Sequence, residues 1–160
     1  MMSFYLPFII GILLLIGISI YSLFWFTKKK TNSVRKKILS GDKTYLSHWT
    51  YDDSINFASF QGRASALSWY KKKLEHVKEV YICPDGVLIG DVIFYSWNRF
   101  AYFKDLKITN GNPACIFIKI EFSAGETETI AEFQIPIPPG KEQEAEEVLD
   151  TLYGIVRFCY

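Results

Sequence analysis

The sequence predicts an α+β fold, in which an apolar N-terminal helix precedes an antiparallel sheet that is closed by a terminal helix. Three observations lead to this prediction: a charge-free run from Phe4 to Phe26, a series of short β-rich runs after Lys78, and amphipathic helical spacing after Gly140. A chain of 160 residues has room for one compact core and a small appendage. We therefore expect one domain that follows one apolar helix in the chain.

The N-terminal run predicts a transmembrane helix over residues 1–27. Its 23 residues from Phe4 to Phe26 contain no charged side chain, and as a helix they would be roughly 34 Å long, enough to cross a hydrocarbon core of about 30 Å. Aromatic residues stand at both ends, as in interfacial belts. A cleaved signal peptide would have a basic start and small residues before the cut, and a core helix in so small a domain is rarely apolar all round.

A basic segment, "TKKKTNSVRKK", follows the apolar run directly. The positive-inside bias places this flank in the cytoplasm, so we expect the N-terminus outside the plasma membrane and the rest of the chain in the cytosol. Three cysteines without a close pair are typical of a reducing compartment. The cations of this cluster are Lys28, Lys29, Lys30, Arg35, Lys36 and Lys37.

Two uses of this basic cluster remain open. It is a stop-transfer flank, or it is a surface that attracts anionic lipid. We assign residues 28–42 to a juxtamembrane linker, in which residues 31–41 form a short juxtamembrane helix or a linker that ends at Gly41. Beyond Lys37 the chain has 12 Lys and Arg against 17 Asp and Glu, a formal charge of −5. That balance argues against nucleic acid as a partner.

The predicted cytosolic domain spans residues 43–160 and begins with a linking strand and helix over residues 43–77. The stretch "KTYLSHWTY" has the composition of a strand. The following residues, from Tyr51 to Val77, have apolar side chains at spacings near 3.6 and a capping Asp52 or Asp53. They predict one helix, in which Gly62 is an unfavourable residue.

The predicted sheet occupies residues 78–138. Turn chemistry separates its runs, as at Pro84-Asp85-Gly86 and at Asn110-Gly111, where glycine or asparagine supplies turn conformations. Five or six consecutive antiparallel strands follow from this order. The β-rich runs are "EVYIC", "VLIG", "VIFYSW", "AYFKDLKIT", "ACIFIKIEF" and "ETIAEFQIPI".

The last predicted element is an amphipathic helix over residues 140–158. Glutamates occupy its first turns, where the helix dipole favours them. An apolar stripe would let this helix cover the exposed face of the sheet. The stripe consists of Ala145, Val148, Leu149, Leu152, Ile155 and Val156.

This order of elements resembles a known family. A strand, a tight "PDG" turn, a strand ending in "YSW", a meander, "IPIPPG" and a terminal amphipathic helix are similar to the pleckstrin-homology-like (PH-like) domains of bacterial membrane proteins of the YcxB-like kind. The resemblance covers about Lys43 to Tyr160. It implies a partial barrel with a C-terminal helix and a membrane-anchored interaction module without enzymatic activity.

Motifs for catalysis, metals and cofactors are missing from the sequence. His48 and His76 are too isolated for a zinc helix motif, no C-x-x-C pair exists, and no phosphate-binding glycine loop occurs. We therefore predict no catalytic residue, no metal site and no cofactor. Cys83 with His76 or His48 is the remaining nucleophile pair, because spatial proximity is not visible in one sequence.

These observations predict a non-catalytic single-pass membrane protein. Its cytosolic module would bind a protein or lipid partner at the inner membrane face. One alternative is an accessory subunit of a larger membrane complex, packed through the small residues Gly11, Gly17, Ser19 and Ser22. The other is a membrane-tethered enzyme that uses Cys83.

Overall fold

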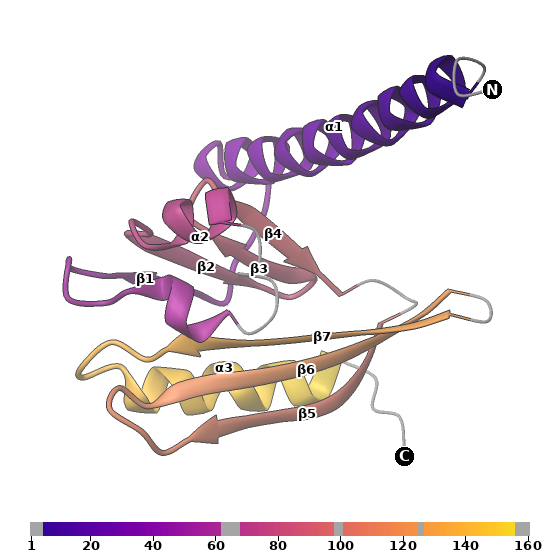
Figure 1. The fold of residues 1–160 in the computed structure, drawn as a ribbon. Coiled ribbons are helices and arrows are strands. Elements are labelled where there is room, and N and C mark those ends of the chain that lie inside the picture. The colour runs from indigo at the N-terminus through magenta and orange to yellow at the C-terminus, as the bar shows by residue number, and fades with distance from the viewer. Residues whose placement is uncertain (1–4, 62–67, 98–100, 125–126, 156–160) are drawn as a thin grey trace.

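The computed structural model describes residues 5–61, 68–97, 101–124 and 127–155. One long helix, α1, lies against a body made of two antiparallel sheets, and its N-terminal half projects away from that body (Figure 1). The closing helix α3 lies along the second sheet. The chain is therefore an α+β protein with an apolar helix at its N-terminus, as predicted.

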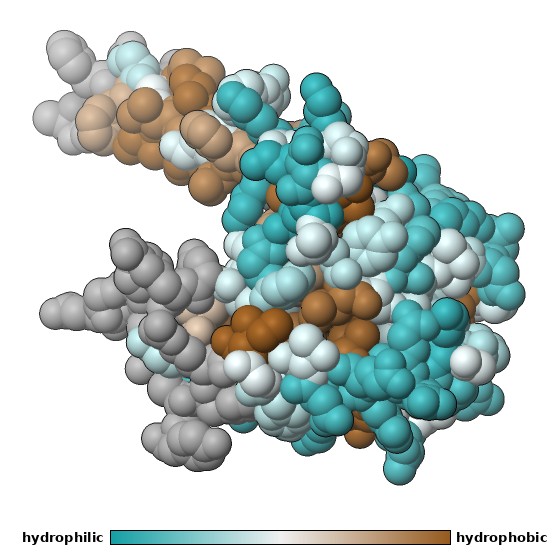
Figure 2. All heavy atoms as spheres, turned by 180° about the vertical axis from the view of Figure 1, so that it is seen from behind, coloured by the Kyte–Doolittle hydropathy of each residue, from teal (hydrophilic) through white to brown (hydrophobic). Residues whose placement is uncertain are grey.

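Helix α1 (Tyr5–Leu39) runs without interruption through the apolar segment and the basic segment. Its part from Pro7 to Leu39 is long and apolar enough to cross a membrane. The apolar side chains of its N-terminal half are exposed, for example Leu23 at 70%, and Figure 2 shows this half as a brown segment that projects from a largely hydrophilic body. This half is therefore not a core helix of the domain.

The basic segment differs from the predicted linker. Of the two alternatives for residues 31–41, the structure has a helix, and this helix continues the apolar one instead of standing apart. It ends where Gly41 takes a φ of 80° and donates its N–H to the Ile38 carbonyl at 3.1 Å. Glycine adopts this left-handed conformation at little cost, which explains the helix end.

The first sheet, sheet A, has four antiparallel strands in the order β1-β2-β3-β4. Each strand pairs with the next one in the chain, and a two-residue turn, Pro84-Asp85, joins β2 to β3. Gly86 lies in β3 beside that turn because a Cβ there would stand 2.4 Å from the Tyr95 carbonyl oxygen. The strands are β1 (Ser47–Thr50), β2 (Glu79–Cys83), β3 (Gly86–Ile89) and β4 (Ile93–Ser96).

The second sheet, sheet B, has three antiparallel strands in the order β5-β6-β7. The strands are β5 (Ala101–Thr109), β6 (Cys115–Ala124) and β7 (Thr127–Pro136). A bulge interrupts the β5–β6 register between Phe103 and Asp105. Bulges bend and twist a strand locally, which helps a three-stranded sheet to curve over a core.

The predicted strands are confirmed, but they form two sheets and not one. The main core lies between the sheets, where the ring of Tyr95 on β4 stacks on Phe133 of β7 at 4.5 Å. Trp49 of β1 and Phe103 of β5 are buried in the same core. Two sheets that face one another bury more apolar surface than a single sheet with a helix on one face, which explains the second layer.

Helix α3 (Glu142–Ile155) closes the domain. Ala145, Val148 and Leu152 are buried as predicted, whereas Ile155 is 48% exposed. Val156 lies outside the described residues. Near its N-terminus Glu144 accepts hydrogen bonds from the Ser47 hydroxyl and, at 3.1 Å, from the Trp49 indole N–H. These bonds hold the start of the helix on β1.

The prediction of a single helix between Tyr51 and Val77 is wrong. A short 3₁₀ helix, η1 (Phe57–Phe60), and helix α2 (Ser68–Leu74) stand there instead, and residues 62–67 between them lie outside the described part. The Asn56 side chain caps η1 by accepting from the Ala58 N–H at 3.1 Å. Each of the two short helices contributes an apolar side chain to the core. Phe57 of η1 and Leu74 at the end of α2 are both fully buried.

Candidate functional site: the docked half of helix α1

The C-terminal half of α1 packs on the outer face of sheet A. A second apolar cluster forms there, separate from the main core, in which Ile38 of α1 meets side chains of three strands and Val34 packs beside them. Both faces of sheet A are thus covered, one by the main core and the other by α1. The strand members of this cluster are Tyr81, Cys83, Leu88 and Phe94.

Two cations of the predicted basic cluster fasten α1 to the sheet. The Lys30 ammonium donates to the Ser96 hydroxyl at 2.7 Å and lies 5.6 Å from the centroid of the Phe94 ring. Arg35 forms an ion pair of 2.7 Å with Glu79. Arg35 is therefore half-buried against the domain, whereas Lys30 contacts the domain and keeps its side chain exposed.

The remaining four cations of that cluster, Lys28, Lys29, Lys36 and Lys37, are exposed. Lys29 lies over the ring of Trp25, 4.8 Å from its centroid. The six residues do not converge on one point, because 3.6 residues per turn distribute them around the helix. The predicted cluster is accordingly divided between a docking face and a solvent face.

Glu79 is the centre of a polar and aromatic cluster between α1 and sheet A. Besides Arg35, its carboxylate accepts from the Tyr81 hydroxyl at 3.1 Å, and His48 Nε2 lies 3.4 Å from it. The His48 ring stacks on Tyr81 with a centroid distance of 4.1 Å, and Tyr45 packs edge-on against both rings. Burial and then the Glu79 charge raise the pKa of Tyr81, so its hydroxyl remains a donor.

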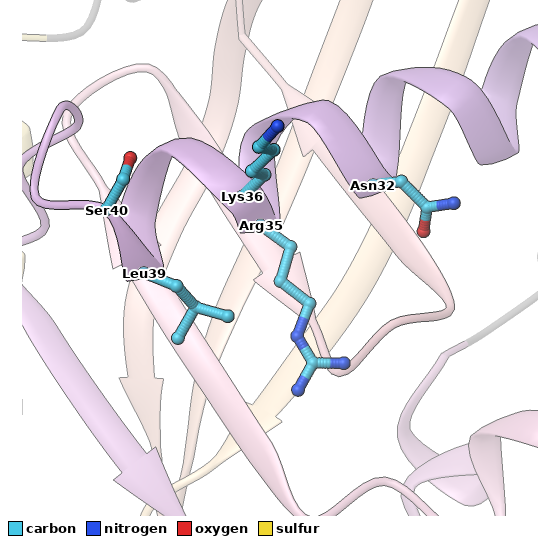
Figure 3. Close-up of a pocket in the computed structure, with 5 residues that line it drawn as sticks. All are labelled: Asn32, Arg35, Lys36, Leu39 and Ser40. Atoms are coloured by element: carbon cyan, nitrogen blue, oxygen red, sulfur yellow. The ribbon is translucent and has the colours of Figure 1, made fainter.

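A shallow, open pocket lies along one side of α1 near this cluster (Figure 3). Figure 3 shows Arg35 extended away from the helix axis, with Leu39 and Ser40 at the end of the helix. The pocket contains two cations and one exposed leucine but no acidic, histidine or cysteine side chain. Its lining residues are Asn32, Arg35, Lys36, Leu39 and Ser40.

The thiols of the described residues are not placed for nucleophilic chemistry. Cys83 is fully buried under α1, and burial raises its pKa to about 11. Burial also raises the pKa of Cys115 to about 11. A thiolate is the reactive form of cysteine, and desolvation disfavours it. Cys159 lies outside the described residues.

The other polar residues that stand near Cys83 in the sequence have structural contacts. Lys43 pairs with Asp85 at 2.5 Å, and the Trp97 indole N–H donates to the Pro84 carbonyl at 2.7 Å. Arg99 lies outside the described residues. Within residues 5–61, 68–97, 101–124 and 127–155, no group of three or more His, Cys, Asp or Glu side chains is arranged to hold a metal ion.

A second group of lysines was missed by the sequence reasoning. Lys71, Lys72 and Lys73 lie on α2, and the Lys73 ammonium is 5.9 Å from the centroid of the Phe24 ring on α1. A run of three lysines is visible in the sequence, and so is the similar run Lys28–Lys30. Their proximity is not, because about 40 residues separate them and only the fold brings α2 to α1.

Comparison with known protein families, with curated proteins and with solved structures finds no match to this chain.

Proposed function

We propose that this chain is a non-catalytic, single-pass membrane protein that presents a cytosolic interaction module at the inner face of the plasma membrane. The N-terminus lies outside and the domain lies in the cytoplasm. Support comes from the apolar part of α1, whose side chains are exposed, and from the cations that follow it. A helix with this surface is stable in lipid and costly in water.

The module is proposed to be PH-like. In support of this proposal, a four-stranded sheet and a three-stranded sheet enclose one core, and a C-terminal amphipathic helix closes it. That arrangement agrees with the partial barrel and terminal helix which the sequence resemblance implies. A domain of this kind takes its function from what its surfaces bind.

One observation carries the proposal: α1 continues unbroken from its apolar half onto the outer face of sheet A. A flexible linker would let the domain turn freely below the membrane. Here the apolar cluster around Ile38 and the Arg35–Glu79 pair hold the domain to the helix. The domain therefore presents a constant side to the bilayer, so the same surface stays available to a partner there.

Site-directed labelling tests the topology. One cysteine is introduced at Glu146, an exposed residue of α3, and in a second variant at Ser3 near the N-terminus. An impermeant maleimide should label Ser3→Cys in intact cells and Glu146→Cys only after permeabilisation. The opposite pattern would overturn the proposed orientation, and labelling of both in intact cells would show that the domain is exported.

The accessory-subunit alternative makes a different prediction for purification. A self-sufficient anchor leaves mild detergent extraction without a stoichiometric membrane partner, whereas a subunit brings one with it. Substitution of Gly11 and Gly17 by leucine would then release the partner, because small residues allow close helix packing. Apart from the adjoining turns of α1, neither glycine has a described atom within 4 Å of its Cβ position, so the domain itself should tolerate both changes.

A further inference from the structure

Two lysine groups from distant parts of the chain lie beside the same stretch of α1. Lys28, Lys29 and Lys30 belong to α1 itself, and Lys71, Lys72 and Lys73 belong to α2. The link between the groups is the Lys73 ammonium, which lies 5.9 Å from the centroid of the Phe24 ring. We call these six residues the lysine surface.

The position of Phe24 sets the depth of this surface relative to a bilayer. Phe24 stands near the end of the apolar run, one residue before Trp25 and four before Lys28. At 1.5 Å per residue, a span of about 30 Å that ends near Phe26 begins near Pro7. Interfacial aromatic residues lie at the level of the lipid headgroups. When α1 crosses the membrane, Lys73 therefore lies in the headgroup layer.

The charge of the lysine surface is not balanced by its own elements. Neither α1 nor α2 contains an aspartate or glutamate. All six lysines are exposed, and among the described residues none of the six has a recorded salt bridge, in contrast to Lys78, which pairs with Asp53. The chain beyond Lys37 has a formal charge of −5. Positive charge is thus concentrated on the membrane side of an otherwise acidic domain.

The geometry points to anionic phospholipid headgroups as the ligand of the lysine surface. We propose that α2 lies on the inner leaflet and that its lysines, together with Lys28, Lys29 and Lys30, bind the phosphates of anionic lipids there. This inference rests on the proposed membrane span of α1. All six lysines are exposed and none of them lines the shallow pocket along α1, so recognition depends on headgroup charge and not on the shape of one headgroup.

Lipid binding at this surface would hold the domain at a second point. Arg35 and Ile38 fix sheet A to α1, while α2 would fix the connection between β1 and β2 to the bilayer. Each lysine near an anionic membrane surface strengthens the equilibrium binding to that surface roughly fivefold. Two lysines removed from α2 should therefore have a measurable effect although four remain.

Amide hydrogen exchange on the full-length chain in lipid nanodiscs tests the proposal. The discs contain phosphatidylcholine alone or an equal mixture with phosphatidylglycerol. We expect exchange in α2 and the residues up to Lys78 to be at least about fivefold slower in the anionic discs. About 1 M salt should remove this difference, because it shortens the screening length to about 3 Å.

Matched variants locate the effect. Lys72→Gln with Lys73→Gln should reduce the protection by anionic lipid at least about fivefold. Lys36→Gln with Lys37→Gln removes the same charge from exposed positions farther along α1 and should preserve the protection. Unchanged exchange in β2 and β3 would show that each variant remains folded. The wild-type comparison between the two discs needs no variant and keeps the test decisive.

The outcomes separate this inference from the proposed function. Equal exchange in both discs would overturn the lysine surface while the chain remains membrane-inserted. Equal loss of protection in both variant pairs would also overturn it, because the effect would then follow total charge. A chain that does not remain with the discs would overturn the membrane span itself and, with it, the inference built on that span.

Discussion

Arg35 on α1 donates to the carboxylate of Glu79 on β2 at 2.7 Å, and this ion pair joins the long N-terminal helix to the sheet. The same carboxylate accepts from the Tyr81 hydroxyl, and His48 lies beside it. One acidic side chain thus connects α1 with two aromatic residues of sheet A. The connection gives the domain a defined orientation relative to the helix, which a flexible juxtamembrane segment would not.

Removal of the Arg35–Glu79 pair should destabilise the docked helix modestly. The side chains are 37% and 22% exposed, so solvent screens the pair and a coupling of about 1 kcal/mol is expected. A double-mutant cycle with Arg35→Met and Glu79→Gln, measured by urea unfolding in detergent, gives this value. Lys36→Met, next to Arg35 and exposed, is the control. A coupling of zero would show that the pair does not contribute to docking.

Docking should depend more strongly on the apolar cluster. Ile38 is 6% exposed and packs in that cluster, whereas its neighbour Leu39 is 65% exposed. Ile38→Ala should lower the free energy of unfolding by about 2 kcal/mol or more through lost burial and a cavity. Leu39→Ala should change it by about 0.5 kcal/mol or less. Similar effects of the two substitutions would mean that α1 does not pack on sheet A.

The Cys83 thiol should react slowly in the folded chain. Burial raises its pKa to about 11 from an ordinary value of 9.0, so at pH 8 its thiolate fraction is about a hundredth of that of an ordinary cysteine. Maleimide labelling followed by mass spectrometry should show a rate at least about a hundredfold lower for the folded than for the unfolded chain. Labelling of Cys83 at the unfolded rate, and faster than Cys115, would support the cysteine-enzyme alternative instead.

Acid should weaken the attachment of α3. Hydrogen bonds from Lys141, then from Ser47 and Trp49, lower the pKa of Glu144 below its ordinary value of 4.5. A carboxyl group whose pKa is lower in the folded state stabilises the fold above about pH 4.5, and this contribution disappears as the pH falls through the folded pKa. Unfolding measured at a series of pH values should show this loss for the natural chain.

Glu144→Gln isolates the contribution of that carboxylate. The amide oxygen still accepts from Ser47 and Trp49, but the group no longer titrates. Stability of the variant should therefore depend less on pH below about 4.5, while its stability near neutrality falls because the charged contact to Lys141 is lost. An identical pH profile for both chains would contradict a role for Glu144 in holding α3.

Several elements of this protein follow from local sequence signals. The charge-free run, the β-rich runs and the stripe of α3 each specify an element through side chains close together in the chain. The apolar stretches of β2 and β3 contain a further signal. Tyr81, Cys83 and Leu88 face α1, whereas Val80, Ile82, Val87 and Ile89 face the main core. Strands without polar alternation indicate a sheet covered on both faces.

Tertiary structure decided which element covers each face. No local pattern shows that α1 continues through its basic residues onto sheet A, because the same cations also suit a solvated linker. Gly86 is similar: its place in a "PDG" stretch suggested turn conformation, but the close approach of Tyr95 and Phe94 requires it. Contacts between residues far apart in the chain leave no periodicity to read.

By itself, the sequence determined the apolar helix, the order of the strands, and the buried residues Ala145, Val148 and Leu152 of α3, because propensity and periodicity act over a few residues. Only the tertiary structure decided that the strands divide into two sheets, that Arg35 meets Glu79, and that Lys73 lies beside Phe24. The physical reason is that burial and charge pairing depend on distance in space. The docked face of sheet A and the lysine surface both depend on contacts between residues that lie far apart in the chain.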